Sequence, residues 1–250
     1  MKKLIGGVFV LTLLWSCSTK EKTKTPYHFS FAGSKALHHF YQYGPEEVKP
    51  IVQGHRGTIE NDLPENSIAA FEYVLSKMPA VFEIDPSLTK DSVIVVFHDA
   101  TLERTTNGTG KLADYTWAEL QELHLKNKKG EITEYKIPTL SEVLEWARGK
   151  TVLILDKKNV PLEMTAAMIR EHKANSYVIN MVRSTEEALF YYNEDPDRMF
   201  SASIRTPETL SEYINAGIPP TQMFACIGTE ITGETPAFCE LLRSHGMRSL

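Results

Sequence analysis

From residue 50 onward, short apolar runs recur along the chain, and segments of helical periodicity separate most of them. The apolar residues in each run are consecutive and do not alternate with polar ones. Continuous apolar strands are typical of a parallel sheet that helices cover on both faces. Seven such runs occur, at residues 51–53, 81–84, 93–97, 152–155, 177–182, 199–204 and 223–227.

This repeat favours an α/β fold, specifically a TIM barrel of the (β/α)8 type, over a doubly wound sheet. The 250 residues of the chain are about the length that one such barrel needs. No glycine-rich phosphate loop follows the first run, which argues against a dinucleotide-binding fold. Helix starts are also readable: Thr139-Leu140-Ser141-Glu142 and Ser184-Thr185-Glu186-Glu187 each fit a capping box.

Residues 99–138 break the rhythm with a long polar segment between the third and fourth runs. Long insertions at strand exits usually carry function, so we expect this insertion to build the pocket for part of the substrate. The other irregularity is the C-terminus, where Met247–Leu250 resembles the opening of a further strand. We therefore expect the barrel to be truncated there and the natural gene to continue.

The N-terminus has the features of an export signal. Met1-Lys2-Lys3 is followed by an apolar run over residues 4–15, which is shorter than a bilayer span requires. We predict a signal peptide at residues 1–16, a lipid-attachment cysteine at Cys17 with a tether over 17–49, and the catalytic barrel at 50–250. The chain would then be an exported, membrane-anchored lipoprotein of the bacterial cell envelope, periplasmic or at the cell surface. A plain cleaved signal with a coincidental cysteine is the alternative.

Composition excludes other classes of protein. A hydrophobic content of 42% excludes a disordered chain. The net charge of −5 argues against nucleic-acid binding, because such domains usually concentrate positive charge. The sequence does not indicate an oligomeric state.

Charged residues stand at the ends of four of the predicted strands, where barrel enzymes place their active sites. Glu83 and Asp85 lie two residues apart, as do Asp156 and Lys158, so each pair shares one face of its strand. Carboxylates without a neighbouring thiol suit a hard divalent cation. We therefore predict a Ca²⁺ or Mg²⁺ site formed by Glu83, Asp85 and Asp156.

The remaining residues at these strand ends suit phosphodiester chemistry. His55 and His98 follow the first and third runs, and imidazoles near a metal suit general acid and base catalysis. Arg56 and Lys158 would bind the phosphoryl oxygens of a substrate. We predict that His55 and His98 are catalytic and that Arg56 and Lys158 are substrate-binding residues.

Several motifs in this region resemble those of the glycerophosphodiester phosphodiesterases. They are Gly54-His55-Arg56-Gly57, Pro64-Glu65-Asn66-Ser67, Phe82-Glu83-Ile84-Asp85, His98-Asp99 with Arg104-Thr105-Thr106-Asn107-Gly108, and Ile137-Pro138-Thr139-Leu140. The resemblance implies a TIM barrel that uses a divalent metal to hydrolyse glycerophosphodiesters to glycerol 3-phosphate and an alcohol. It also implies that the paired histidines, the metal ligands and the phosphate-contacting arginine fall on the residues predicted above, with Glu65 and Asn66 supporting the site.

One motif departs from the family. Its fourth strand usually carries Glu-x-Lys, whereas this chain has Asp156-Lys157-Lys158, which places the carboxylate one methylene further back. Two other functions remain open. One is a phospholipase of the same barrel type that acts on intact lipid. The other is a non-catalytic lipoprotein that binds glycerophosphodiesters.

Overall fold

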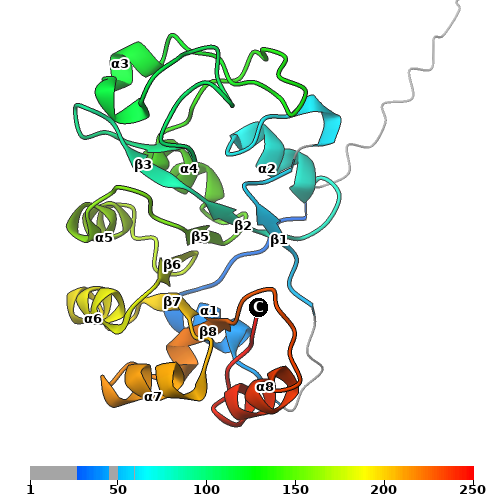
Figure 1. Ribbon diagram of the computed structural model, residues 1–250, viewed down its shortest axis with the longest axis vertical. Helices are drawn as coiled ribbons and strands as arrows, with labels where there is room; N and C mark the ends of the chain where they lie inside the picture. The colour runs from blue at the N-terminus through cyan, green and yellow to red at the C-terminus, as the bar shows by residue number, and fades with distance from the viewer. Residues whose placement is uncertain (1–26, 45–49, 59) are drawn as a thin grey trace, which may run out of the picture.

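The computed structural model describes residues 27–44, 50–58 and 60–250 and contains a curled parallel sheet with helices outside it (Figure 1). Six strands form this sheet in the order β1-β2-β5-β6-β7-β8, and every neighbouring pair is parallel. They are β1 (Gln53–His55), β2 (Val81–Ile84), β5 (Leu153–Leu155), β6 (Val178–Val182), β7 (Met199–Ser203) and β8 (Met223–Cys226). The predicted α/β class is confirmed, with a half-barrel of six strands in place of the full eight.

A helix follows each of these strands, as the alternating pattern predicts. These helices are α2 (Ile68–Leu75), α4 (Leu140–Ala147), α5 (Leu162–Glu171), α6 (Thr185–Glu194), α7 (Pro207–Asn215) and α8 (Thr235–Ser244). The other helical segments are α1 (Ser34–Tyr41), the short α3 (Trp117–Leu120) and 3-10 turns at Glu60–Asp62, Leu112–Asp114 and Pro220–Gln222.

The predicted helix starts are confirmed in one case and half-confirmed in the other. At α4 the Thr139 hydroxyl accepts from the Glu142 amide, and the Glu142 carboxylate accepts from the Thr139 amide. At α6 Ser184 caps the helix by accepting from the Glu187 amide. The Glu187 carboxylate, however, accepts from the amide of Arg183, one residue before the cap.

The prediction of a third barrel strand at residues 93–97 is wrong. This run forms β4 (Ile94–Val96), which pairs antiparallel with β3 (Pro86–Leu88) in a separate hairpin, and β5 lies directly beside β2. Pro86 has no N–H to continue a ladder, and the Asp85 carbonyl accepts from the Phe97 amide at 2.8 Å. A buried apolar run has the same sequence pattern in a barrel strand and in a strand of a separate hairpin, so periodicity alone could not distinguish the two.

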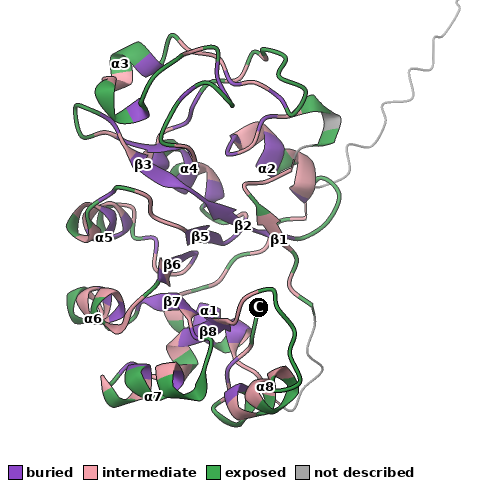
Figure 2. Cartoon of the chain, in the orientation of Figure 1, coloured by how far each residue is buried: buried purple, intermediate pink, exposed green. Residues whose placement is uncertain are grey.

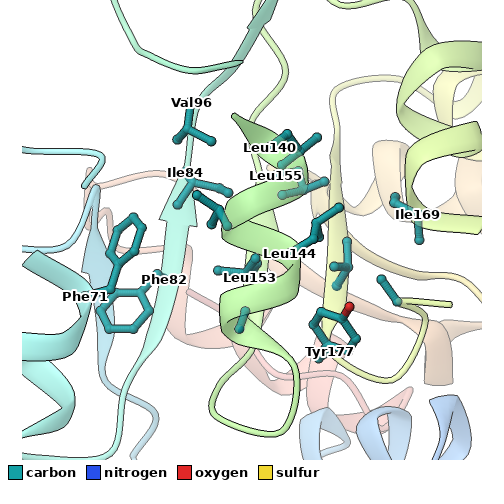
Figure 3. Close-up of a cluster of buried hydrophobic side chains, with 14 of the residues drawn as sticks. Phe71, Phe82, Ile84, Val96, Leu140, Leu144, Leu153, Leu155, Ile169 and Tyr177 are labelled. Atoms are coloured by element: carbon teal, nitrogen blue, oxygen red, sulfur yellow. The ribbon is translucent and has the colours of Figure 1, made fainter. Parts of the chain in front are cut away.

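Side chains alternate between the two faces of the sheet. Phe82, Ile84, Leu153 and Leu155 point outward and pack against α2 and α4 in the largest apolar cluster (Figure 3). Burial of one such side chain contributes about 1.5–3 kcal/mol to folding. The intervening residues point to the inside of the curl, where they pack against α1 at one end. Figure 2 shows most of the strands as buried and the outer helices as partly exposed, whereas β1 at the edge of the sheet is only partly buried.

At the C-terminal end, the residues after α8 return to β8. The Ala225 amide donates to the Arg248 carbonyl at 2.8 Å, and the Leu250 amide donates to the Ala225 carbonyl at 2.8 Å. The bridge between Ala225 and Ser249 is parallel, as a further strand would require. These contacts are isolated bridges and not an assigned strand, so the predicted truncation of the barrel stays a prediction.

The predicted signal peptide and Cys17 lie outside the described residues. Within the described part of the chain, no helix is both long and apolar enough to cross a bilayer.

Candidate active site

The inward-facing side chains become acidic at the carboxyl ends of β2 and β5. Val81 and Ile154 belong to the inner apolar cluster, so Glu83, Asp85 and Asp156, which lie an even number of residues further along, point the same way. One oxygen from each of these three carboxylates lies within 4.8 Å of the others. The predicted metal-ligating residues are therefore brought together.

Asp85 is fully buried, and both of its oxygens have partners. Oδ2 accepts from Asn66 Nδ2 at 2.7 Å and lies 3.2 Å from Arg56 Nε, while Oδ1 lies 2.8 Å from Lys158 Nζ. Such pairing is required because an isolated buried charge is very costly. The two predicted phosphate-binding residues, Arg56 and Lys158, thus contact the acidic group directly.

Glu83 is also buried, but its carboxylate has fewer hydrogen-bond and ion-pair partners than that of Asp85. Its Oε2 atom has no hydrogen-bond partner among the described residues. Burial, together with the negative charges of Asp85 and Asp156, raises the pKa of Glu83 to about 8. A buried acceptor that resists ionisation and faces two other carboxylates is the setting that a hard cation stabilises. The residues present therefore fit a divalent metal.

Asp156 links the acidic group to two basic side chains. Its Oδ2 atom lies 2.7 Å from Lys158 Nζ, and its Oδ1 atom accepts from the guanidinium of Arg183 at the end of β6. Burial opposes the charge of Lys158, but hydrogen bonds to Asp156 and Asp85 outweigh burial and raise its pKa. The shorter aspartate thus stands in an ion-paired network. Our reading of the sequence missed Arg183, because its contact with Asp156 spans 27 residues.

A tight turn after β1 places Arg56 beside these carboxylates. The Arg56 amide donates to the Glu83 carbonyl at 3.0 Å, and the Arg56 backbone is left-handed with φ of 59°. Gly57 follows with φ of 92°, and a Cβ there would lie 3.0 Å from Phe71 and Ala70 of α2. Glycine at this position therefore lets the turn pack directly on the helix.

His55 is the last residue of β1 and lies at the edge of the acidic group. Its Nε2 atom is 3.6 Å from Glu83 Oε2, and 69% of its side chain is exposed. Partial burial, with the positive charge of Arg56 as a second cause, lowers the pKa of His55. The imidazole is therefore kept neutral near pH 7 and can accept a proton.

His98 reaches the site from a different element than expected, because it follows the β4 arm of the hairpin. Its Nδ1 atom lies 2.6 Å from Asp99 Oδ1. A hydrogen bond from Arg104 is the main cause that lowers the pKa of Asp99 to about 2, so Asp99 is ionised and the hydrogen belongs to Nδ1 of His98. The Nε2 atom of His98 is thereby left for proton transfer.

Arg104 connects this histidine to the turn after β1. It donates to Asp99 through Nε at 2.5 Å and to Glu65 through Nη1 at 2.8 Å and Nη2 at 2.7 Å. Glu65 in turn accepts from Arg56 at 3.2 Å. The supporting position expected for Glu65 agrees with this geometry, which joins the insertion to the barrel through a chain of ion pairs.

A family profile and a similar crystal structure both relate this chain to the same family of proteins. The profile of the glycerophosphoryl diester phosphodiesterase family matches residues 55–219. A crystal structure of a glycerophosphoryl diester phosphodiesterase from Parabacteroides distasonis is 48% identical, with a TM-score of 0.86 over 89% of this chain and 78% of that one.

The curated relatives align with shorter segments of this chain. A glycerophosphodiester phosphodiesterase of Caldanaerobacter subterraneus is 43% identical over 108 residues, which are 43% of this chain and 44% of that protein. Glycerophosphodiester phosphodiesterase 1 of Rattus norvegicus is 36% identical over 177 residues, which are 68% of this chain and 53% of that protein. The chain thus spans about half the length of the curated relatives that it matches.

Proposed function

The chain belongs to the glycerophosphoryl diester phosphodiesterase family, and from this premise we propose that it hydrolyses glycerophosphodiesters to glycerol 3-phosphate and an alcohol. The observation that supports the proposal is the arrangement at the mouth of the curl. There, three inward carboxylates lie with Arg56 and Lys158, His55 lies 3.6 Å from Glu83, and His98 is close enough to His55 for its charge to affect the pKa of that histidine.

Glu83, Asp85 and Asp156 would hold a Ca²⁺ or Mg²⁺ ion, directly or through water. When bound, such an ion polarises a phosphoryl oxygen and neutralises its developing charge. Arg56 and Lys158 lie beside the same carboxylates and would orient the phosphodiester through charge-assisted hydrogen bonds.

The two histidines would divide the proton transfers. His55, with its lowered pKa, is suited to take a proton from the attacking water as the water oxygen forms a bond to phosphorus. His98, whose Nδ1 is held by Asp99, would deliver a proton from Nε2 to the alcohol oxygen as the bond from phosphorus to that oxygen breaks. The pair as a whole gains and loses no proton, and solvent returns the proton from His55 to His98 before the next turnover.

The test is an assay that measures release of glycerol 3-phosphate from deacylated glycerophosphodiesters. We expect turnover that EDTA abolishes and Ca²⁺ or Mg²⁺ restores. Release of the head-group alcohol from the diacyl lipid, with no turnover of the deacylated diester, would show a phospholipase instead. Metal-dependent binding of diesters without any turnover would show a binding protein.

The proposal includes the site of action. The basic and apolar N-terminus and Cys17 support an exported lipoprotein anchored in the envelope membrane. Metabolic labelling with palmitate should mark the wild-type chain and leave Cys17→Ala unlabelled. Equal labelling of both would refute the anchor.

A further inference from the structure

A polar cavity adjoins the acidic group on the side away from β1. It has a volume of about 350 Å³ and is lined by the carboxyl ends of β6 and β7, the first turn of α6 and the first two turns of α7. Its charged lining residues are Arg183, Arg205, Glu186 and Glu212. The proposed reaction gives none of these residues a role.

Strand register places the cavity beside the reaction centre. Val182 pairs with Ala202, so Arg183, the first residue after β6, lies beside Ser203, the last residue of β7. Arg183 contacts Asp156, which also contacts Lys158. Neighbouring strands are about 4.8 Å apart. A small substituent on a phosphate bound at β2 and β5 would therefore extend into the space over β6 and β7.

The two arginines differ in their partners. Arg183 is engaged by Asp156, whereas Arg205 is exposed and has no ion pair within the described residues. Tyr213 of α7 provides a second group without a partner, since it is 1% exposed and its hydroxyl makes no hydrogen bond in the described part of the chain. Burial and nearby glutamates raise the pKa of Tyr213 to about 12, which keeps this hydroxyl a donor.

The competing cavity lies on the insertion side, where we expected the alcohol to bind. It is lined by Glu65, Arg104 and residues 126–130. Arg104 is committed to Glu65 and Asp99 there, and Lys129 Nζ lies 2.8 Å from Asp62. Lys126 Nζ donates to the Glu103 carbonyl at 2.9 Å, so Lys128 is the one basic side chain of this cavity without a partner among the described residues.

From these observations we propose that the cavity between α6 and α7 is a subsite for the alcohol of the diester, and that it selects an alcohol carrying an amino-acid group, as serine does. The guanidinium of Arg205 would bind the carboxylate, and Glu212 would face the ammonium. This inference rests on the proposed function, because it concerns the leaving group of that reaction.

Glycerophosphoserine and glycerophosphoethanolamine form a matched pair of probes, since their head groups differ by one carboxylate. We expect the wild-type protein with Ca²⁺ to favour the serine diester by roughly tenfold in kcat/KM, the size of one charge-assisted contact. Arg205→Ala should reduce this preference to near one, and Arg205→Lys should keep part of it.

Two variants serve as controls. Arg170→Ala removes the same charge from the last turn of α5, at the opposite end of the barrel, and should keep the preference. Lys128→Ala removes a charge from the insertion-side cavity. Loss of the preference in Lys128→Ala and not in Arg205→Ala would overturn the inference, as would a wild-type preference near one.

Equilibrium binding separates this inference from the proposed function. Calorimetry with His55→Ala in the presence of Ca²⁺ should show tighter binding of the serine diester, and adding Arg205→Ala should remove the difference. That result without turnover by the wild type would refute the hydrolase and retain the subsite. Equal affinity for the two diesters would refute the subsite.

Discussion

The mouth over β1, β2 and β5 differs from the mouth over β6 and β7 in how its charges are held. In the first region the ionic groups are largely buried, and Asp85 alone contacts Arg56, Asn66 and Lys158. In the second region Arg205 is exposed and has no ion pair within the described residues. Charges that are removed from water must be paired in a defined geometry, whereas an exposed charge needs no partner in the protein and can pair with a bound ligand. The first arrangement suits catalysis at the phosphodiester, and the second suits recognition of the alcohol group of the substrate.

The largest effect that this comparison predicts concerns the histidines of the first region. His55→Ala and His98→Ala should each lower kcat by about 10²–10⁴-fold, because each removes one proton-transfer group. Steady-state kinetics on a glycerophosphodiester measures this effect, with His172→Ala as a control at the C-terminal cap of α5, where the ring contacts Ser141 of α4. Near-normal turnover in either variant would contradict its assigned role.

Next in size is the loss of cation binding. Glu83→Gln keeps the shape and removes the charge, so Ca²⁺ affinity should fall by roughly 100-fold or more, as expected when a carboxylate ligand is lost. Calorimetry with Ca²⁺ measures it, and Glu163→Gln on α5 is the matched control. Unchanged affinity in Glu83→Gln would show that the cation, if any, binds elsewhere.

The length of Asp156 can be tested with the same titration. Asp156→Glu should hold or tighten Ca²⁺ binding, because it brings the carboxylate one methylene closer to Glu83 and Asp85. A large loss would mean that the network with Lys158 and Arg183 is built around the shorter side chain.

A smaller effect should follow from removing the hydrogen bond that Asn66 donates to Asp85. Asn66 has a left-handed backbone with φ of 54° and donates to Asp85, so Asn66→Ala loses a hydrogen bond to a charge and adds backbone strain. The free energy of unfolding should fall by about 2–4 kcal/mol, as measured with urea. Asn66→Gly removes the side chain without the strain and should lose less. A glycine variant as stable as wild type would show that this hydrogen bond contributes nothing.

The smallest effect concerns the exposed ion pairs that join the insertion to the barrel. Because Arg104 is the main cause of the low pKa of Asp99, Arg104→Ala should return that pKa toward its ordinary value near 4. The ionised Asp99 stabilises the fold above its unfolded pKa, and this contribution is lost as pH falls through about 2. In the variant the folded and unfolded pKa values nearly coincide, so this contribution should be largely absent at every pH. Carboxyl NMR titration measures the shift, and an unmoved Asp99 would contradict the assignment.

What the sequence determined by itself is local. The strand–helix repeat predicts the parallel sheet, and the two-residue spacing of Glu83 and Asp85 places them on one face, because side-chain alternation is a property of a single strand. The same reasoning correctly aligned Asp156 with Lys158. These features follow from backbone geometry within a few residues of each position.

The tertiary structure decided which faces and ends meet. The run at residues 93–97 left the barrel for a hairpin because its backbone groups are satisfied by β3 and not by β5. The contact of Arg183 with Asp156 and the place of Arg205 beside it follow from the registers of β5, β6 and β7. Register is set by the closing of the whole sheet over its core, and no local pattern in the chain records it.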